Sequence, residues 1–343
     1  MSDSKIIDIG SAASRAGVRE VSDSVASYSR VDRPAFAVIV PAYNEAENIG
    51  PLFEALEATF ARHSLNGEVI LVDDGSTDET FAKAVAAASR MGDRARVARH
   101  RRNMGKTEAM LTGAREARAD VFIIFDADLQ HSTEEIPRFM ERIDAGWDIV
   151  TGRKIGAYEK RAVSSVYNRL SRFLFDVPVR DLNSMKAFRR EVLENIPLRH
   201  DWHRFFVVIA YARGFSVTEI EIELFPRRAG VSKYTGAGRI ASSVGDLLVV
   251  WFYLRFSRKP MQFFGGIGLV LTLLGLVIGI VASVFRALGM GPPPFGYRPV
   301  LGLVVLLVVV GITLFGFGFT AEMIALLRSD VEQLKIRETR RDD

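Results

Sequence analysis

Apolar and polar residues alternate in a regular order through the first two thirds of the chain. Four short runs rich in branched or aromatic residues are predicted as strands: 36–41, 68–74, 95–100 and 121–128. The stretches between them are predicted as helices: 45–62, 77–91 and 104–118. Strands that are apolar along their whole length are typical of a parallel sheet covered by helices on both faces. The pattern therefore predicts a Rossmann-like α/β domain with a mostly parallel sheet.

Two short polar patterns mark expected helix starts. Ser76 with Glu79, and Ser132 with Glu135, have the spacing of a capping box. In that motif the two side chains satisfy backbone N–H groups that the first helical turn leaves unpaired. We therefore expect a helix to begin at each pair.

Two runs without any charged residue, 261–285 and 299–321, lie in the last third of the chain. A membrane-spanning helix needs about 20 apolar residues, so each run is long enough to cross a membrane. The Pro- and Gly-rich connector between them is predicted as a short exposed turn. A very apolar helix hairpin in a soluble protein is the alternative, and the length of both runs disfavours it.

Positive charges are distributed unevenly around these runs. Lysines and arginines flank their outer ends, whereas the connector holds only Arg286 and Arg298. The positive-inside rule therefore predicts that the N-terminal part and the tail lie in the cytoplasm, with the helices in the plasma membrane.

The remaining segments complete the expected domain order. Residues 1–34 are predicted as a mobile leader, 35–235 as the folded cytoplasmic domain, and 327–343 as a basic tail. Residues 236–259 are predicted as an amphipathic helix in the membrane interface, ahead of the two spans within 260–326. The apolar face of that helix would consist of Ile240, Val244, Leu247, Trp251 and Leu254. A plain packing helix is the alternative.

Composition and absent motifs exclude several kinds of site. The chain has no cysteine, so it has neither a disulfide framework nor a thiolate metal site. No Gly-x-Gly-x-x-Gly follows the first strand, and no Gly-x-x-x-x-Gly-Lys-Ser/Thr occurs anywhere. A dinucleotide-binding domain and a P-loop are therefore both disfavoured. Nothing in the pattern predicts nucleic acid as a partner.

Acidic residues cluster where two predicted strands end, in VDDGSTDET (72–80) and DADLQH (126–131). Ligands of such sheets bind beyond the carboxyl ends of the strands. Asp126 and Asp128 would face the same way on a strand, and Gln130 would join them if the chain stays extended. Such oxygen ligands suit Mg²⁺ or Mn²⁺, and so few of them imply a phosphorylated substrate that completes the shell. A simple turn is the alternative.

The other acidic cluster places Asp73 and Asp74 next to each other, so their side chains point apart on a strand. One is expected to face the ligand and accept hydrogen bonds from a base or ribose. The other is expected to shape the Asp-Gly-Ser turn. A helix cap and turn is the alternative for either residue.

Four motifs together resemble a known family. PAYNEAENI, VDDGSTDET, DADLQH and TGRK, in this order, resemble the inverting family-two glycosyltransferases of the A-type fold. The two trailing apolar runs, with FPRRAGVSKY upstream of them, resemble the polyprenyl-phosphate glycosyltransferases, relatives of dolichyl-phosphate mannose synthase. The resemblance covers roughly residues 35–325. It implies an A-type glycosyltransferase domain, then the interfacial helix and a two-helix transmembrane hairpin.

The resemblance also implies roles for single residues. The nucleotide sugar would be held by Pro41, Tyr43, Glu45, Asp74, Asp126, Ala127, Arg227, Arg228 and Lys233. The metal ligands would be Asp126, Asp128 and Gln130. Asp128, Arg153 near the donor phosphates and Arg161 near the acceptor phosphate would be catalytic. The segment with Arg227, Arg228, Ser232 and Lys233 would close over the donor; a solvated charge run or a lipid-headgroup patch is the alternative.

The implied reaction moves one sugar from a UDP- or GDP-linked donor to polyprenyl phosphate at the cytoplasmic leaflet, by an inverting displacement that needs Mg²⁺ or Mn²⁺. A phosphate monoester has a second pKa of about 6, so it is mostly dianionic at neutral pH and can attack without a general base. His131 and His203 are therefore not required as bases. The sequence predicts neither which sugar is transferred nor which nucleotide base the donor carries.

Some features keep alternatives open. A lipid hydroxyl such as that of diacylglycerol would need a carboxylate base, with Asp181 or Asp201 as candidates, and a non-catalytic membrane scaffold is a third reading. DLNSMKAFRR (181–190) departs from the family's Gly-Phe-Arg/Lys pattern, which leaves the roles of Asp181 and Lys186 in a sugar pocket open. The Gln-x-x-Arg-Trp motif of processive synthases is absent, which disfavours polymer synthesis. Small residues in GGIG and LFGFGF suggest packing between copies, as a homo-oligomer such as a tetramer.

Overall fold

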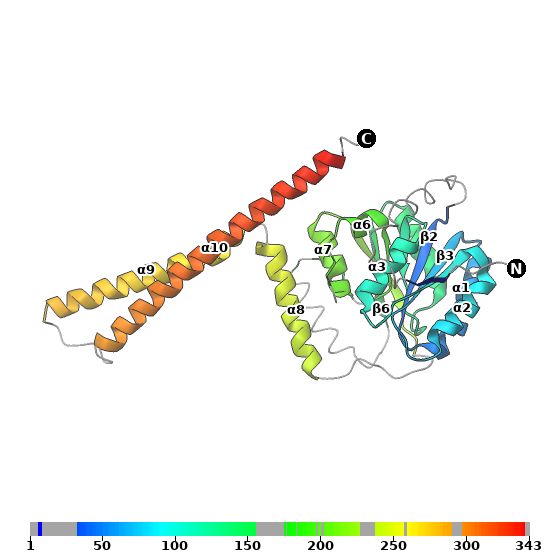
Figure 1. The fold of residues 1–343 in the computed structure, drawn as a ribbon, viewed down its shortest axis with the longest axis horizontal. Coiled ribbons are helices and arrows are strands. Elements are labelled where there is room, and N and C mark those ends of the chain that lie inside the picture. The colour runs from blue at the N-terminus through cyan, green and yellow to red at the C-terminus, as the bar shows by residue number, and fades with distance from the viewer. Residues whose placement is uncertain are drawn as a thin grey trace. The chain divides into compact units, whose positions relative to one another are not determined.

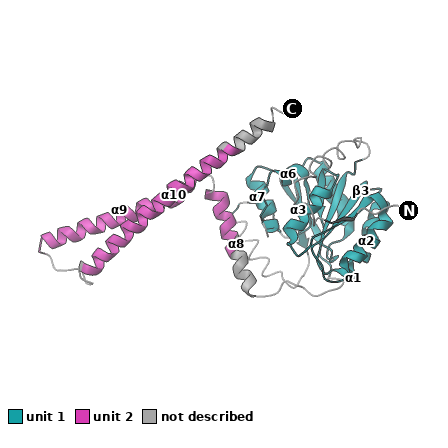
Figure 2. Cartoon of the chain, in the orientation of Figure 1, with its two compact units in different colours: residues 1–244 teal, residues 245–343 magenta. Residues whose placement is uncertain are grey.

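The computed structural model describes residues 6–8, 33–155, 175, 177–182, 184–196, 198–199, 202–226, 237–256, 259–289 and 297–339. The chain divides into two compact units, Met1–Val244 and Gly245–Asp343 (Figure 2). The described part of the first unit holds the sheet and its covering helices, and the described part of the second consists of helices.

The described strands form one eight-stranded sheet in the order β1-β4-β3-β2-β5-β7-β6-β8 (Figure 1). Their bounds are Ile6–Asp8 (β1), Phe36–Ala42 (β2), Gly67–Asp73 (β3), Ala95–Arg99 (β4), Val121–Ile124 (β5), Ile149–Ile155 (β6), Lys186–Arg189 (β7) and Val217–Glu223 (β8). Strands β1 to β5 pair in parallel, and β8 is parallel to β6. Strand β7 lies antiparallel between β5 and β6. The predicted mostly parallel sheet is confirmed.

Helices cover both faces of this sheet because its central strands are apolar on both sides. Helices α1 (Ala46–Arg62), α2 (Thr80–Met91) and α4 (Ile136–Asp144) share one hydrophobic core with one face. Helix α3 (Lys106–Glu116) packs so closely on the other face that a Cβ on Gly113 would lie 2.4 Å from Ile39. Helix α7 (Phe206–Ala212) covers that same face, where Phe206 packs against Phe188, with ring centroids 4.5 Å apart. The shorter helical elements are η1 (Gly92–Arg94), η2 (Thr133–Glu135), α6 (Arg190–Glu194) and η3 (Trp202–Phe205).

The helix starts differ from the capping-box prediction. Helix α2 begins at Thr80, and Ser76 does not cap it; the Ser76 hydroxyl instead accepts the N–H of Asn44 at 2.9 Å. The carboxylate of Asp78 accepts the Thr80 N–H at 3.0 Å in its place. Ser132 does accept a backbone N–H, but from Glu134 at 3.2 Å, so it caps the turn η2 that leads into α4.

One short strand lies inside the segment expected to be a mobile leader. Residues Ile6–Asp8 pair in parallel with β4. The edge of β4 leaves backbone N–H and C=O groups unpaired, and a short apolar segment can satisfy them. Three residues carry too little pattern to predict such a strand from the sequence.

The second unit begins within α8 (Ala237–Phe256), whose bounds are close to those of the helix predicted over 236–259; its position in a membrane interface stays a prediction. Leu247 and Val250 are fully buried, whereas Leu248 and Val249 are more than half exposed. The described half of the helix therefore has one buried side, which includes Val250 as well as the predicted Leu247, and it exposes apolar side chains on another side.

Helices α9 (Pro260–Ala287) and α10 (Tyr297–Thr339) contain the two uncharged runs. Among the described residues, Pro260–Ala287 and Arg298–Ser329 are the stretches long and apolar enough to cross a membrane. Large apolar side chains project outward along both, for example Val270, which is 63% exposed, and Leu301, which is 65% exposed. A soluble core helix would bury such residues, so these two helices have the character of membrane spans.

Glycines hold α9 and α10 together within one chain. A Cβ on Gly268 would lie 2.5 Å from the carbonyl oxygen of Gly311, and one on Gly318 would lie 2.9 Å from the backbone nitrogen of Gly265. Small residues allow such close approach of helix backbones in membranes. Gly265, Gly268 and Gly318 of the two small-residue motifs are therefore used within the hairpin itself, and packing between copies stays a prediction.

Candidate active site

The loops after β2 and β3 are tied together by hydrogen bonds. Asn44 adopts a left-handed backbone with φ 52°, its amide oxygen accepts the N–H of Thr77 at 2.8 Å, and the N–H of Glu45 donates to Thr80 at 2.8 Å. The predicted base and ribose residues Pro41, Tyr43 and Glu45 therefore stand beside the Asp-Gly-Ser turn at the carboxyl edge of the sheet. Their roles stay predictions.

Asp73 shapes the turn after β3, as one of the two aspartates was expected to do. Its carboxylate accepts the N–H of Ser76 at 3.1 Å and pairs with Arg99 at 3.1 Å. Gly75 has φ +72°, and a Cβ there would lie 2.4 Å from the backbone of Arg102. Only glycine fits this position without moving the next loop.

Asp74 organises the loop that leads into α3. It is only 4% exposed, and its carboxylate accepts the N–H groups of Met104 and Gly105, each at 2.8 Å. The ring of His100 also lies 2.7 Å from one carboxylate oxygen. A contact with the nucleotide base stays a prediction, but the structure shows that Asp74 also fixes the position of the next residue, Lys106.

Lys106 is the first residue of α3, and its ammonium pairs with the carboxylate of Asp126 across the edge of the sheet. Burial raises the pKa of Asp126, but the Lys106 ammonium outweighs burial and holds that pKa well below the usual range of a carboxyl. Asp126 is therefore ionised at any working pH. Lys106 was not predicted as a site residue, because its only local signal is its place after Gly105 at the start of a predicted helix.

The DADLQH segment is not an extended strand. Strand β5 ends at Ile124, and Leu129 has φ 55°, so the chain turns within the motif. The expectation that Asp126, Asp128 and Gln130 share one strand face is therefore wrong. Asp128 is 8% exposed, and one of its oxygens accepts the N–H of Gln130 at 3.2 Å. The motif is a loop that its own backbone holds in place.

The oxygen donors of this loop fit Mg²⁺ or Mn²⁺ as a partial set. Among the described residues, no group of three His, Cys, Asp or Glu side chains could hold a metal ion. The ionised Asp126, with Asp128 and the amide of Gln130, offers hard oxygen ligands. These ligands are too few to fill the coordination shell of the ion. Phosphate oxygens of a substrate would complete such a shell, which is the usual arrangement for Mg²⁺ with nucleotides.

A second group of charges lies one strand further along the edge. Lys186, the first residue of β7, is 7% exposed, and its ammonium donates to the carbonyl of Leu182 at 3.3 Å. Asp181 is 4% exposed and pairs with Lys154 at 3.8 Å. Burial, with repulsion from Lys106, lowers the pKa of Lys186 to about 8. The structure thus brings both residues of uncertain role, Asp181 and Lys186, to the site.

His203 lies on the α3 side of this group, in the turn η3. Thr107 accepts the backbone N–H of His203 at 3.2 Å, and its hydroxyl lies 3.1 Å from ring nitrogen Nδ1. Burial, together with Lys106 and Lys186, lowers the pKa of His203 well below its usual range, so the ring is neutral at pH 7. The Thr107 hydroxyl has one proton to donate and two lone pairs, so it donates to Nδ1 in one tautomer of the ring and accepts from Nδ1 in the other.

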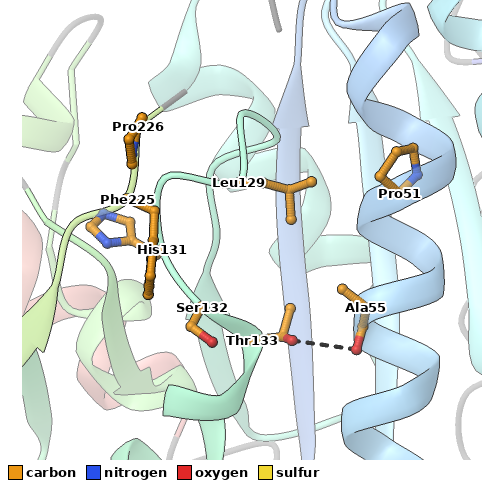
Figure 3. A pocket seen from close by; sticks show the side chains of 8 residues that line it. All are labelled: Pro51, Ala55, Leu129, His131, Ser132, Thr133, Phe225 and Pro226. Atoms are coloured by element: carbon orange, nitrogen blue, oxygen red, sulfur yellow. Dashed lines mark hydrogen bonds between the residues drawn. The ribbon is translucent and has the colours of Figure 1, made fainter. Parts of the chain in front are cut away.

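His131 lines a cleft of about 540 Å³ (Figure 3). The cleft is lined by Pro51, Ala55, Leu129, His131, Ser132, Thr133, Phe225 and Pro226. Burial lowers the pKa of His131 to about 4, so the ring is neutral. Neither Asp126 nor Asp128 is among the residues that line this cleft. The backbone N–H of Phe225 donates to the carbonyl of Gln130 at 2.9 Å, so the segment after β8 is anchored to the metal loop.

Of the remaining predicted site residues, the structure describes only some. Arg153 lies in β6 and pairs with Glu221 of β8 at 2.9 Å. Ala127 is buried in the metal loop. The others fall outside the described residues: Arg161, Asp201, Arg227, Arg228, Ser232 and Lys233.

The chain is similar to proteins of a known family. Residues 37–210 match the family described as Glycosyl transferase family 2. A dodecaprenyl-phosphate galacturonate synthase of Rhizobium johnstonii is 32% identical over 297 residues, which are 84% of this chain and 87% of that protein. An undecaprenyl-phosphate 4-deoxy-4-formamido-L-arabinose transferase of Klebsiella pneumoniae is 28% identical over 86% of this chain and 89% of that protein.

A solved structure has a similar fold. Glucosyl-3-phosphoglycerate synthase from Mycobacterium tuberculosis, crystallised with Mn²⁺, uridine diphosphate and phosphoglyceric acid, matches 64% of this chain and 78% of its own, with a TM-score of 0.53. Its sequence identity is 17%, so the similarity concerns the fold alone.

Proposed function

Because the chain belongs to glycosyl transferase family 2, we propose that it transfers one sugar from a nucleotide diphosphate sugar to polyprenyl phosphate. The observation that carries the proposal is the ionised Asp126, with Asp128, in a loop at the carboxyl edge of a parallel sheet. The two similar transferases named above act on polyprenyl phosphates, and their similarity extends over most of the chain. Their sugars differ, so the family by itself does not determine the sugar.

The residues of the chain have distinct tasks in this reaction. Asp126 and Asp128 would hold Mg²⁺ or Mn²⁺, which when bound offsets the charge that develops on the leaving nucleoside diphosphate. Lys106 pairs with Asp126 in the free protein and stands at the start of α3, where its charge can also serve the diphosphate. Asp74 keeps this lysine in place through the loop before α3.

No general base is needed if the acceptor is a phosphate dianion. His131 and His203 are both neutral, and His203 is bonded to Thr107. A lipid hydroxyl as acceptor would require a carboxylate base, and the candidate Asp181 is buried and paired with Lys154. This pairing argues against Asp181 as that base.

The two apolar helices place the enzyme in the membrane where its lipid substrate lies. We infer from the flanking cations that the catalytic unit and the C-terminal tail face the cytoplasm. The interfacial helix α8 would then lie at the lipid headgroups. The orientation can be tested with a variant that carries a cysteine in the 290–296 connector. A chemical label that reacts only with exposed cysteines is applied to whole cells that contain this variant. Labelling from the cytoplasmic side alone would contradict it.

The test of the reaction uses the full chain in detergent with Mg²⁺. A panel of UDP- and GDP-sugars is offered with short polyprenyl phosphate, with the matching polyprenol, and with neither. We expect one donor to release its nucleotide only with the phosphate. The variants Asp128→Ala and Asp128→Asn should lose transfer by about 100-fold or more, whereas Asp144→Ala, at the exposed end of α4, should keep it.

Two results would count against the proposal. Equal turnover with polyprenol would assign the enzyme to lipid hydroxyls. Full activity of both Asp128 variants, with the fold intact by circular dichroism, would remove the metal assignment.

A further inference from the structure

The strand order arranges the parts of a donor along one edge of the sheet. Strands β3 and β2 carry the predicted base and ribose residues, and β5 comes next with the metal loop. Strands β7 and β6 follow. A nucleotide diphosphate sugar is linear in the same sense, from base through diphosphate to sugar. If its base lies over β3 and β2 and its phosphates lie at β5, the sugar lies over β7 and β6.

Lys186 lies at that position. It is the first residue of β7, and it pairs with Ile124, the last residue of β5, and with Thr151 of β6. Asp126 of the metal loop is two residues beyond Ile124. The Lys186 side chain therefore belongs to the floor of the region where the sugar would sit.

The ammonium of Lys186 lacks an acidic partner among the described residues. The other two lysines of the site have one each, since Lys106 pairs with Asp126 and Lys154 pairs with Asp181. The bond that the structure shows for Lys186 is one to the carbonyl of Leu182, at 3.3 Å, which leaves two of its three donors for other groups. A charged group that is 7% exposed and unpaired is unfavourable in the free protein. An anion supplied by a ligand would remove that cost.

Three anions take part in the proposed reaction: the diphosphate, the acceptor phosphate, and any carboxylate on the sugar. The diphosphate has the metal loop and Lys106 at β5. Phosphates are usually held by several cations or by the planar fork of arginine, whereas a carboxylate can be satisfied by one ammonium and one further donor. The neutral ring of His203 lies on the same face of the sheet, and its Nε2 is such a donor in the tautomer whose Nδ1 accepts from Thr107. The position and the single buried charge therefore fit a carboxylate best.

We propose that the donor sugar carries a carboxylate, as a uronic acid does, and that Lys186 binds it. The inference rests on the proposed function, because it assigns the sugar of that same reaction. Lys186 then acts as a specificity-determining residue that distinguishes a carboxylate at the sugar's C6 from a hydroxymethyl group. A neutral sugar would leave the ammonium unpaired beneath it, which is how a buried charge rejects the wrong ligand.

The experiment measures donor binding by calorimetry to the full chain in detergent with Mg²⁺ and without acceptor. Two matched pairs of probes are used, UDP-galacturonate with UDP-galactose and GDP-mannuronate with GDP-mannose, next to UDP and GDP alone. The variants are Lys186→Met, Lys186→Arg and, as control, Lys83→Met on the exposed face of α2, where the side chain is 46% exposed.

For the base that binds, we expect wild type and Lys83→Met to prefer the uronate by about tenfold or more over the neutral sugar. Lys186→Met should reduce this ratio to about one, while its affinity for UDP or GDP alone changes less than about threefold. Lys186→Arg, which keeps the charge, should retain part of the preference.

Three outcomes overturn the inference and leave the proposed function standing. The first is equal binding of the uronate and the neutral sugar by wild type. The second is an equal loss for UDP or GDP alone in Lys186→Met, which would assign Lys186 to the diphosphate. The third is a Lys186→Met variant that keeps the preference for the uronate. Failure of every nucleotide to bind would instead overturn the proposed function together with the inference.

Discussion

Replacing Lys186 by methionine should make the free protein more stable while it weakens donor recognition. Lysine and methionine have unbranched side chains of similar length, so the substitution removes the charge with little change in shape. In the described structure the ammonium is 7% exposed and has no carboxylate within salt-bridge distance. The folded state of the wild type therefore carries an unfavourable charge that the unfolded chain does not.

The size of this effect follows from the pKa of Lys186, which burial lowers from 10.5 to about 8. At about 1.4 kcal/mol for each pKa unit, this lowering corresponds to roughly 3–4 kcal/mol in the free energy of unfolding. We expect Lys186→Met to recover part of this at pH 7, roughly 1–3 kcal/mol. Lys83→Met, on the surface, should change stability by less than about 0.5 kcal/mol.

The dependence on pH gives a second, independent signature. The folded wild type loses the Lys186 proton near pH 8, whereas the unfolded chain keeps it until about pH 10.5. Between these values the unfolded state binds more protons, so the stability of the wild type rises with pH. The advantage of Lys186→Met should therefore be largest at pH 7 and shrink progressively from pH 8 towards pH 10.5.

The assay is urea unfolding of the full chain in detergent micelles, followed by tryptophan fluorescence at pH 7, 8.5 and 10. Trp202, in the turn η3, is 8% exposed and reports on the unit that contains Lys186. A loss of stability by more than about 1 kcal/mol in Lys186→Met would refute the reasoning, because it would show that the ammonium has a favourable partner in the free protein. An advantage that does not change with pH would show that packing, not charge, is responsible.

Three further predictions concern other contacts of the structure. Lys106→Met should bind Mn²⁺ more tightly without nucleotide, by about tenfold in electron paramagnetic resonance titrations, because the ion no longer competes with an ammonium for Asp126; unchanged affinity would contradict the pairing. Asp74→Ala leaves two backbone N–H groups without their acceptor and should lower the free energy of unfolding by roughly 3 kcal/mol in the same urea assay. Gly268→Leu should separate α9 from α10 and reduce the melting temperature in detergent by several degrees, whereas Gly302→Leu, which meets open space, should not.

Much of the architecture was readable from the chain itself, because it depends on local periodicity. The continuous apolar runs before Pro41, Asp73 and Asp126 predicted parallel strands covered on both faces, and the structure confirms them. The two uncharged runs predicted the long helices α9 and α10. These features need only the repeat of the backbone and the length of a run, which the order of residues contains directly.

The site itself was only partly readable. The motifs predicted that acidic residues would meet at one edge, but not that Asp74 would bond to Met104 and Gly105, or that Lys106 would reach Asp126. The turn at Leu129 also removed the simple geometry expected for DADLQ. The contacts of Asp74 and Lys106 depend on which loop lies next to which, and these loops are separated by 20 or more residues.

The sequence by itself determined the fold class, the likeness to sugar transferases and the apolar helices, since local patterns specify them. Only the tertiary structure decided the surroundings of Lys186. Strand β7 lies antiparallel between β5 and β6, so its first residue, Lys186, lies at the carboxyl edge of the parallel strands. Charged residues from four other segments lie near it. Whether a lysine is paired or unpaired depends on the distances between those segments in space, and the free energy of a buried charge follows from those distances and not from the order of the residues.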